Sequence, residues 1–411
     1  MDDLARLAPG QRRGGILMPA ADASDTGVPA APLPARVAIV THDLHPYGAE
    51  RVAVAIADSL RSAFGVRCEM ASLGGGSLAV ALRRSIPVHM LGVLWTAAQR
   101  DIAPVAHAMR ARGYRHVILN TVLCGGTASV FRRMGYAVLG LVHEMPGLIR
   151  QVGVEGRLAS LHEHAHAVVY PDEEVSRSIE AEFGPLPRPA EVGFLPQGLI
   201  RRNPWRHRAK EARAEAERLL GLPRDRPFVL AVGSGVERKG LDFFLAVARI
   251  LNERRSRPTV FAWIGDVDER YRSQLAERGL WQDPLPDYLR FPGYVPDTAA
   301  FHRAADVFAL TSREDPFPNV VLESMDAGVP VVAFAGTGGG AKLAGAVAGR
   351  AVPSFDVEAY ADAVEALLDD QEARRATGAL AARTVDDRYS FEAYAGRLLG
   401  MLAEVSVDEP G

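Results

Sequence analysis

Short apolar runs alternate with longer segments of helical periodicity from Arg36 onward. Apolar runs of about four to eight residues are typical of strands buried in a parallel sheet. The first half of the chain contains six of them: Val37–Val40, Arg67–Ala71, His116–Leu119, Ala137–Val142, Ala167–Val169 and Val192–Leu195. Helical spacing between these runs predicts amphipathic helices over Glu50–Leu60, Ala97–Arg112 and Glu173–Glu182.

The same alternation begins again after a charged, helix-prone segment at Arg206–Leu220. Further strands are predicted at Phe228–Val232, Thr259–Ile264, Tyr288–Phe291, Val307–Leu310 and Val329–Phe334. Strands that alternate with helices indicate parallel βαβ units with helices on both faces of a sheet. We therefore predict two consecutive doubly wound α/β domains. Ligands bind such sheets at the carboxyl ends of the strands, so a cleft between facing domains is expected.

The length of the chain agrees with this division, because 411 residues are too many for one ordinary core. Residues 1–34 are rich in Ala, Pro, Gly and Asp without periodicity and are predicted to be a disordered tail. The first domain is expected over residues 35–205 and the second over residues 206–388. A last helix is predicted at Phe391–Glu404, within residues 389–411.

The segment Ser312–Ser324, which reads SREDPFPNVVLES, carries Asp315 and Glu323 on either side of a proline-broken loop. Asn319 stands where a helix N-cap is expected, and a helix that begins there directs unpaired N–H groups at whatever lies in front. Two acids around that opening suit a ligand that is anionic at one point and hydroxylated around it, such as a nucleotide-diphosphate sugar. The alternative is ordinary helix capping.

A second phosphate-type loop follows the strand at Phe228–Val232, where the chain reads GSGVERKG. Gly233 and Gly235 form the turn, and Arg238 and Lys239 are predicted to stand at the start of the next helix. The helix dipole disfavours cations there unless an anion shares the site. A solvated Arg-Lys pair is the alternative. Together the two loops favour a nucleotide-diphosphate site.

Loops at the ends of two first-domain strands are expected to close the cleft. Gly48 and Ala49 follow the first strand, and their small side chains let the backbone approach a ligand. His143 and Glu144 follow the strand at Ala137–Val142, which is where this architecture places ligand contacts. A structural turn and a satisfied structural histidine are the alternatives.

These motifs and their order resemble the retaining family 4 glycosyltransferases (glycosyl transferases group 1) of the GT-B fold. The resemblance rests on the GSGVERKG loop and the Asp315 and Glu323 pair, and it covers roughly Arg36 to Leu402. It implies two Rossmann-like domains and a last helix that packs back on the N-terminal, acceptor-side domain. Family members usually carry Glu where this chain has Asp315, with Glu314 just before it, and the register favours Asp315 as the acid that contacts the sugar.

The resemblance also implies roles for single residues. Arg238 and Lys239 would neutralise the donor diphosphate, Asp315 would bind sugar hydroxyls, and His143 would face the transferred sugar. Glu323 would bind the ribose, and Tyr294 belongs to a loop that resembles the family's base-holding loops. The remaining donor-binding residues are expected to be Gly48, Ala49, Gly233, Gly235, Pro318, Asn319, Val320 and Val321.

The expected activity is therefore the transfer of a hexose or related sugar, with retention and without a metal, from a nucleotide-diphosphate donor to a hydroxyl acceptor. A UDP- or GDP-linked donor is the substrate and no cofactor is expected. The acceptor would be a sugar or a lipid-linked glycan, in the synthesis of cell-surface polysaccharide or glycolipid. Two alternatives remain open: a nucleotide-sugar epimerase of similar shape and a non-catalytic nucleotide-sugar-binding subunit.

Composition narrows the partners and the compartment. A net charge of −3 gives no basic field for nucleic acid, and two isolated cysteines suit the cytoplasm. Arginines in the first domain, such as Arg83-Arg84 and Arg132-Arg133, would suit peripheral contact with the inner face of a membrane. His162, His164 and His166 lack a completing ligand, and Asp266-Val267-Asp268 is explained by a turn and a helix start, so no metal site is predicted.

Overall fold

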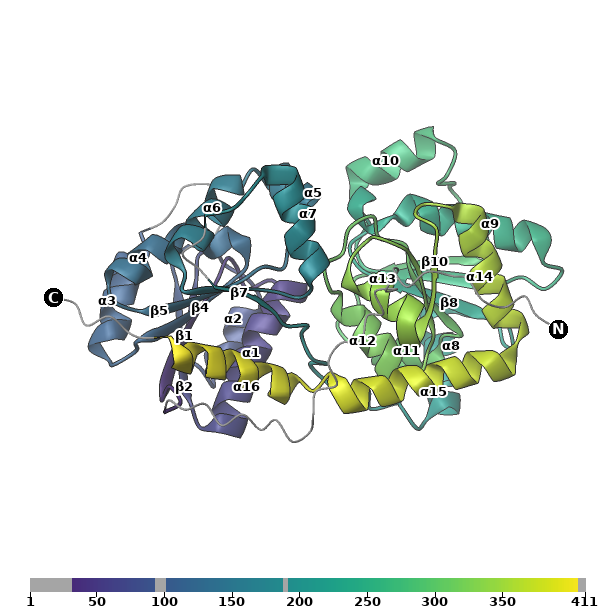
Figure 1. The fold of residues 1–411 in the computed structure, drawn as a ribbon. Helices are drawn as coiled ribbons and strands as arrows, with labels where there is room; N and C mark the ends of the chain where they lie inside the picture. The colour runs from purple at the N-terminus through teal and green to yellow at the C-terminus, as the bar shows by residue number, and fades with distance from the viewer. Residues whose placement is uncertain (1–31, 93–100, 188–190, 406–411) are drawn as a thin grey trace, which may run out of the picture.

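The computed structural model describes residues 32–92, 101–187 and 191–405. Two lobes lie side by side, and each is built on one parallel sheet with helices on both faces (Figure 1). Except for residues 32–34, the predicted tail lies outside the described residues, as do residues 97–100 of one predicted helix.

The first lobe carries a seven-stranded sheet in the order β3-β2-β1-β4-β5-β6-β7. Its strands are β1 Arg36–Thr41, β2 Arg67–Ser72, β3 Val88–Met90, β4 His116–Asn120, β5 Ala137–Leu141, β6 Ala167–Tyr170 and β7 Glu191–Phe194. Its helices are α1 Gly48–Phe64, α2 Leu78–Leu82, α3 Ala103–Ala111, α4 Ala128–Arg133, α5 Pro146–Val152, α6 Glu155–His164 and α7 Glu173–Phe183. The register pairs Thr41 with Asn120 and Asn120 with Leu141, so the loops after β1, β4 and β5 leave the sheet at one edge.

The second lobe carries a six-stranded sheet in the order β10-β9-β8-β11-β12-β13. Its strands are β8 Phe228–Val232, β9 Val260–Ile264, β10 Leu289–Gly293, β11 Val307–Leu310, β12 Val331–Phe334 and β13 Gly349–Val352. Its helices are α8 Ala209–Leu220, α9 Leu241–Arg254, α10 Glu269–Glu277, α11 Ala299–Ala304, α12 Asn319–Asp326, α13 Gly339–Leu343, α14 Val357–Asp369 and α15 Gln371–Arg388. The last helix of the chain is α16 Phe391–Glu404.

Both faces of each sheet are buried, which explains why the strands read as unbroken apolar runs. In β8, Phe228 and Leu230 enter one core with residues of α8, α12 and α15. Val229 and Ala231 enter the core on the opposite face, with residues of α9 and α14. The continuous apolar pattern is therefore a direct consequence of helices on both sides.

The predicted fold class, two doubly wound α/β sheets, is confirmed. Every strand predicted from the sequence is present to within two residues at either end. Two strands were missed, β3 and β13, which lie at edges of the two sheets. Both are short and only partly buried, and pairing with β2 and β12 positions them, so no apolar run marks them in the sequence.

The chain crosses between the lobes twice, and the two crossings are joined. The Leu199 N–H donates to the Tyr389 carbonyl at 2.8 Å, and a Cβ on Gly198 would lie 2.4 Å from the backbone nitrogen of Phe391. After this point α16 packs against α1 of the first lobe, where Leu398 and Leu402 are fully buried (Figure 1). Among the described residues, none of the helices combines the length and the apolar character that a membrane span requires.

Candidate functional site

An ion pair joins the two candidate loops of the second lobe. The Nζ atom of Lys239 contacts Oδ2 of Asp315, and Ser312 Oγ lies 3.4 Å from the same carboxylate oxygen. Arg238 donates from its guanidinium to the Glu314 carbonyl at 2.9 Å. The loops after β8 and β11 therefore form one connected surface at the carboxyl edge of the sheet.

The turn that carries the cations differs from the prediction. Arg238 and Lys239 lie in a single 3₁₀ turn, Glu237–Lys239, and α9 begins only at Leu241. Gly240 separates the two with φ of 71°, and a Cβ there would lie 1.9 Å from the Thr311 carbonyl oxygen. The cations are therefore held by contact with the second loop, and the N-terminus of α9 does not position them.

Burial makes Lys239 a strong partner for an anion. Desolvation lowers the pKa of its ammonium, the charge of Arg238 lowers it further, and Asp315 opposes both. A cation that has lost part of its hydration gains more from a second negative group than an exposed lysine does. This is the electrostatic property that a diphosphate site requires.

The two neighbouring acids point to different places. Asp315 is buried against Lys239, and its N–H donates to the Thr337 carbonyl at 2.8 Å. The carboxylate of Glu314 instead accepts from the Gly147 N–H of the first lobe at 3.3 Å. Glu314 therefore contacts the first turn of α5 in the first lobe, whereas Asp315 belongs to the cation pair.

The expected N-cap at Asn319 is wrong. Pro318 occupies the N-cap position of α12 and Asn319 is the first helical residue. The Asn319 amide instead connects the lobes: its Oδ1 accepts from Gln197 Nε2, and its Nδ2 lies 3.4 Å from the Gly48 carbonyl. The Val321 N–H lies 3.1 Å from the Pro318 carbonyl.

Glu323 lies one turn into α12 and is held by a buried histidine. His302 Nε2 lies 3.2 Å from Glu323 Oε2, and His302 Nδ1 lies 2.8 Å from Ser324 Oγ. Burial alone would raise the pKa of Glu323, but His302, together with the charge of Arg51 from the first lobe, lowers it overall. The carboxylate is therefore ionised at neutral pH and lies within ion-pair distance of His302 where the two lobes meet.

At the carboxyl edge of the first sheet, His143 is oriented by a chain of hydrogen bonds. Asn120 donates from Nδ2 to the Ala49 carbonyl at 2.9 Å, which fixes its Oδ1 as an acceptor. His143 Nε2 lies 3.1 Å from that Oδ1 and must therefore carry the proton. Burial, with a smaller effect from His42, lowers the pKa of His143 to about 4, so Nδ1 is a free acceptor at neutral pH.

Glu144 lies beneath His143 and is nearly inaccessible. Its Oε2 accepts from the N–H groups of His143 and Val122 at 2.9 and 3.2 Å. Burial raises the pKa of Glu144 to about 7, although these two hydrogen bonds and His42 oppose the shift. The group is therefore close to half protonated near neutral pH.

One group of side chains in the described part of the chain could approach a metal ion: His42, Asp43 and Glu50. His42 Nε2 lies 3.0 Å from Glu50 Oε1. Burial opposes protonation of His42, but Glu50 raises its pKa overall. Metal binding requires the neutral imidazole, and Glu50 favours the protonated form, so this pair opposes a metal ion here.

The predicted residues Gly233, Gly235 and Tyr294 lie around the loops that follow β8, β9 and β10. Gly233 has φ of 153° and faces the Lys239 side chain, whereas a Cβ on Gly235 would lie within 2.9 Å of Val267. Gly235 is therefore required for packing against the loop after β9. Tyr294 is exposed, and its N–H donates to the Asp266 carboxylate at 3.0 Å.

Two groups of contacts were missed by the sequence reasoning. Gln197 is buried between the lobes and donates to the Phe317 carbonyl at 3.0 Å, and no sequence pattern marks it. The run Gly338–Gly340 follows β12, and a Cβ on Gly338 would lie 1.9 Å from the Asp315 carbonyl oxygen. A glycine run directly after an apolar strand could have indicated this close approach.

A known protein family resembles the second lobe in sequence, and solved structures resemble most of the chain in fold. Residues 212–384 match the family model described as Glycosyl transferases group 1. The lipopolysaccharide core biosynthesis glycosyltransferase LpsE of Rhizobium meliloti is 33% identical over 45% of this chain and 52% of its own length. The first curated relatives are thus matched over only about half of their length.

Two other proteins match over most of this chain. The GDP-mannose-dependent alpha-(1-6)-phosphatidylinositol monomannoside mannosyltransferase of Mycobacterium tuberculosis is 26% identical over 80% of both chains. Anabaena Alr3699/HepE, solved in complex with UDP-glucose, has a TM-score of 0.73 and 18% identity over 90% of this chain and all of its own.

Proposed function

Because the chain belongs to the glycosyl transferases group 1 family and has the GT-B fold, we propose that it transfers a sugar from a nucleotide-diphosphate donor to a hydroxyl acceptor with retention. The observation that carries this proposal is the ion pair between Lys239 and Asp315 at the carboxyl edge of the second sheet. A buried cation whose partner is a single carboxylate can accept a diphosphate as a further partner.

The proposed roles follow the surroundings of each group. Arg238 and Lys239 stabilise the charge that develops on the departing diphosphate, which is the interaction that accelerates such a reaction. Glu323, ionised beside His302, accepts hydrogen bonds from the ribose hydroxyls. Asp315 orients the donor sugar. From the opposite lobe, Nδ1 of His143 accepts a hydrogen bond from a hydroxyl of that sugar.

The proposed route needs no metal and no protein base. The acceptor hydroxyl attacks the anomeric carbon on the face from which the diphosphate departs, and the leaving phosphate oxygen takes the proton. The Mycobacterium relative, named as GDP-mannose-dependent, and HepE, solved with UDP-glucose, support UDP- and GDP-linked hexoses as the first donors to test. Lipid-linked or cell-surface glycans are the proposed acceptors, used in the cytoplasm at the inner face of the membrane.

Thermal shift with a panel of UDP- and GDP-sugars selects the donor, because a ligand that binds the folded state raises the melting temperature. Proton NMR of the selected donor, with and without acceptor glycosides, then follows the sugar. Transfer with an unchanged anomeric configuration supports the proposal. An inverted product, epimerisation of the donor without acceptor, or binding without any turnover would each contradict it.

A further inference from the structure

A pocket lies on the edge of the second sheet opposite to the candidate donor loops. Its walls include Pro227, Asp306 and Pro330, which stand at the amino ends of β8, β11 and β12. The candidate donor loops follow the carboxyl ends of β8 and β11. The pocket is therefore separate from the site described above.

The pocket is strongly basic. Eight arginines and four carboxylates line it, which is a formal excess of four positive charges, and its volume is about 1010 Å³. Ligand pockets typically have volumes of about 300–1,000 Å³, so the space is sufficient for a molecule of nucleotide size. The chain as a whole has a net charge of −3, so this positive charge is a local feature.

Some of the arginines hold the walls together. Arg206 lies 3.2 Å from Asp326 and also pairs with Asp386, while Arg213 lies 2.9 Å from Glu217. The guanidinium of Arg374 lies 3.0 Å from Asp306. Arg226 lies 3.6 Å from Asp287. Four of the eight arginines are therefore paired with carboxylates and have a structural role.

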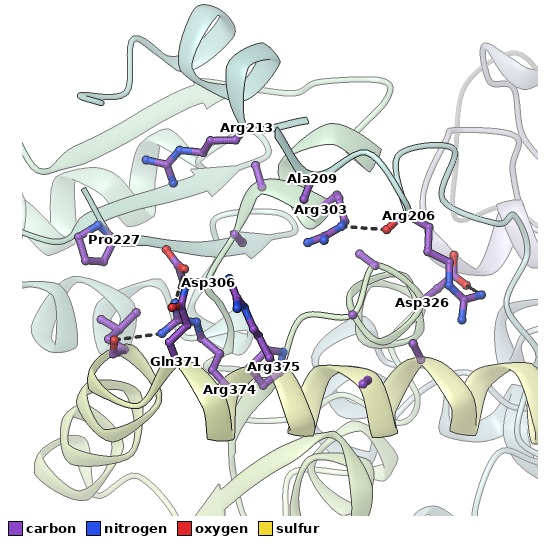
Figure 2. A pocket seen from close by; sticks show the side chains of 18 of the residues that line it. Arg206, Ala209, Arg213, Pro227, Arg303, Asp306, Asp326, Gln371, Arg374 and Arg375 are labelled. Carbon is purple, nitrogen blue, oxygen red and sulfur yellow. Dashed lines mark hydrogen bonds and ion pairs between the residues drawn. The ribbon is translucent and has the colours of Figure 1, made fainter. Parts of the chain in front are cut away.

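The other arginines have no such explanation. Arg257, Arg303, Arg375 and Arg383 form no ion pair with any residue that the structure describes. Arg303 donates only to the Arg206 carbonyl at 3.0 Å, although it is partly buried and burial lowers its pKa. Figure 2 shows Arg303 of α11 and Arg375 of α15 extending into the pocket from opposite walls. Arg257, Arg375 and Arg383 are exposed to water, so they stay charged and accessible to a ligand. Guanidinium groups that converge in a concave space without carboxylate partners form a surface with which an anion can pair.

We propose that this pocket binds an anion with more than one phosphate group. Planar guanidinium groups on different elements can each donate paired hydrogen bonds to the oxygens of a phosphate group. A concave site encloses a compact ligand better than it fits an extended flat surface. The phosphate groups could belong to a free metabolite or to lipid headgroups, and the test below separates these sources. The proposal goes beyond the proposed transfer and does not depend on turnover.

The probe for the free ligand is inorganic tripolyphosphate, titrated into the full chain by calorimetry. A Lys239→Met background removes the main cation of the donor site, so that binding there does not obscure the pocket. In this background we expect one binding event, which Arg375→Glu with Arg383→Glu weakens at least tenfold. Arg278→Glu, which reverses an exposed arginine outside the pocket, is the matched control and should bind as the background does.

The lipid source is tested by sedimentation with phosphatidylcholine vesicles with or without 30% phosphatidylglycerol. Binding to the anionic vesicles that the double reversal abolishes, without binding of tripolyphosphate, would assign the pocket to headgroups. Both substituted residues are exposed, so we expect the reversal variant to melt as the background does. An unchanged melting curve then excludes misfolding as the cause of weaker binding. The proposal is overturned if neither probe binds, or if the double reversal binds both probes as the background does.

Discussion

Glu144→Gln tests the electrostatics beneath His143 most directly. Glu144 is 4% exposed, and burial raises the pKa of its carboxyl group to about 7 from the ordinary value of 4.5. Glutamine keeps an oxygen that can accept from the Val122 and His143 N–H groups, but it cannot ionise. The substitution therefore removes the titration and keeps the shape.

The stability of the protein depends on pH because the folded and unfolded chains bind different numbers of protons. Between pH 4.5 and pH 7 the unfolded chain has released the Glu144 proton and the folded chain still holds it, so stability falls as pH rises through this window. A rise of the Glu144 pKa from 4.5 to about 7 corresponds to roughly 3 kcal/mol, at about 1.36 kcal/mol for each tenfold change in proton affinity. Below the window the wild type and Glu144→Gln should have similar stability, and above it the variant should be more stable by this amount.

Urea unfolding at pH 5 and pH 8.5 measures this difference in stability. Circular dichroism is the suitable probe, because the two lobes can unfold separately and it reports the helices of both. We expect the difference between variant and wild type to grow by about 2–3 kcal/mol between these pH values. Glu277→Gln, an exposed acid on α10, is the matched control and should show no such growth. A pH-independent difference for Glu144→Gln would refute the reasoning.

Four further outcomes are expected. Lys239→Met should lower kcat/KM of the proposed transfer about 100-fold or more, because the cation that stabilises the departing diphosphate is lost. Lys210→Met, at an exposed lysine, is the control and should leave kcat/KM unchanged. Wild-type activity of Lys239→Met would exclude the leaving-group role. Nitrogen-15 NMR should show His143 neutral and protonated at Nε2 from pH 5.5 to pH 8, and a titration in that range would contradict the assignment. Asn120→Ala should destabilise the first lobe by about 1–3 kcal/mol in urea, since the Ala49 carbonyl loses one donor and buried His143 Nε2 loses its acceptor; no change would mean that solvent replaces both. Gly338→Ala should lower the melting temperature, because its φ is 125° and its Cβ would lie 1.9 Å from the Asp315 carbonyl oxygen, while Gly400→Ala, which meets nothing, should not.

Much of the site's location could be predicted, but its contacts could not. The loops with Lys239, Asp315 and His143 follow predicted strands, and parallel strands bring the loops at their carboxyl ends to one edge. The sequence did not indicate that Asp315 pairs with Lys239 while Glu314 reaches Gly147. Adjacent side chains on a loop point in different directions, and only the packed loop decides which acid faces which lobe.

Two doubly wound sheets follow from local sequence pattern, because strands buried on both faces must be apolar throughout and the helices between them must be amphipathic. The edge strands β3 and β13, the role of Asn319 between the lobes, the contact of Gln197 and the convergence of Arg303 and Arg375 instead depend on how the chain packs. These features depend on pairs of residues far apart in the chain, so periodicity, which reports only local neighbours and burial, carries no record of them.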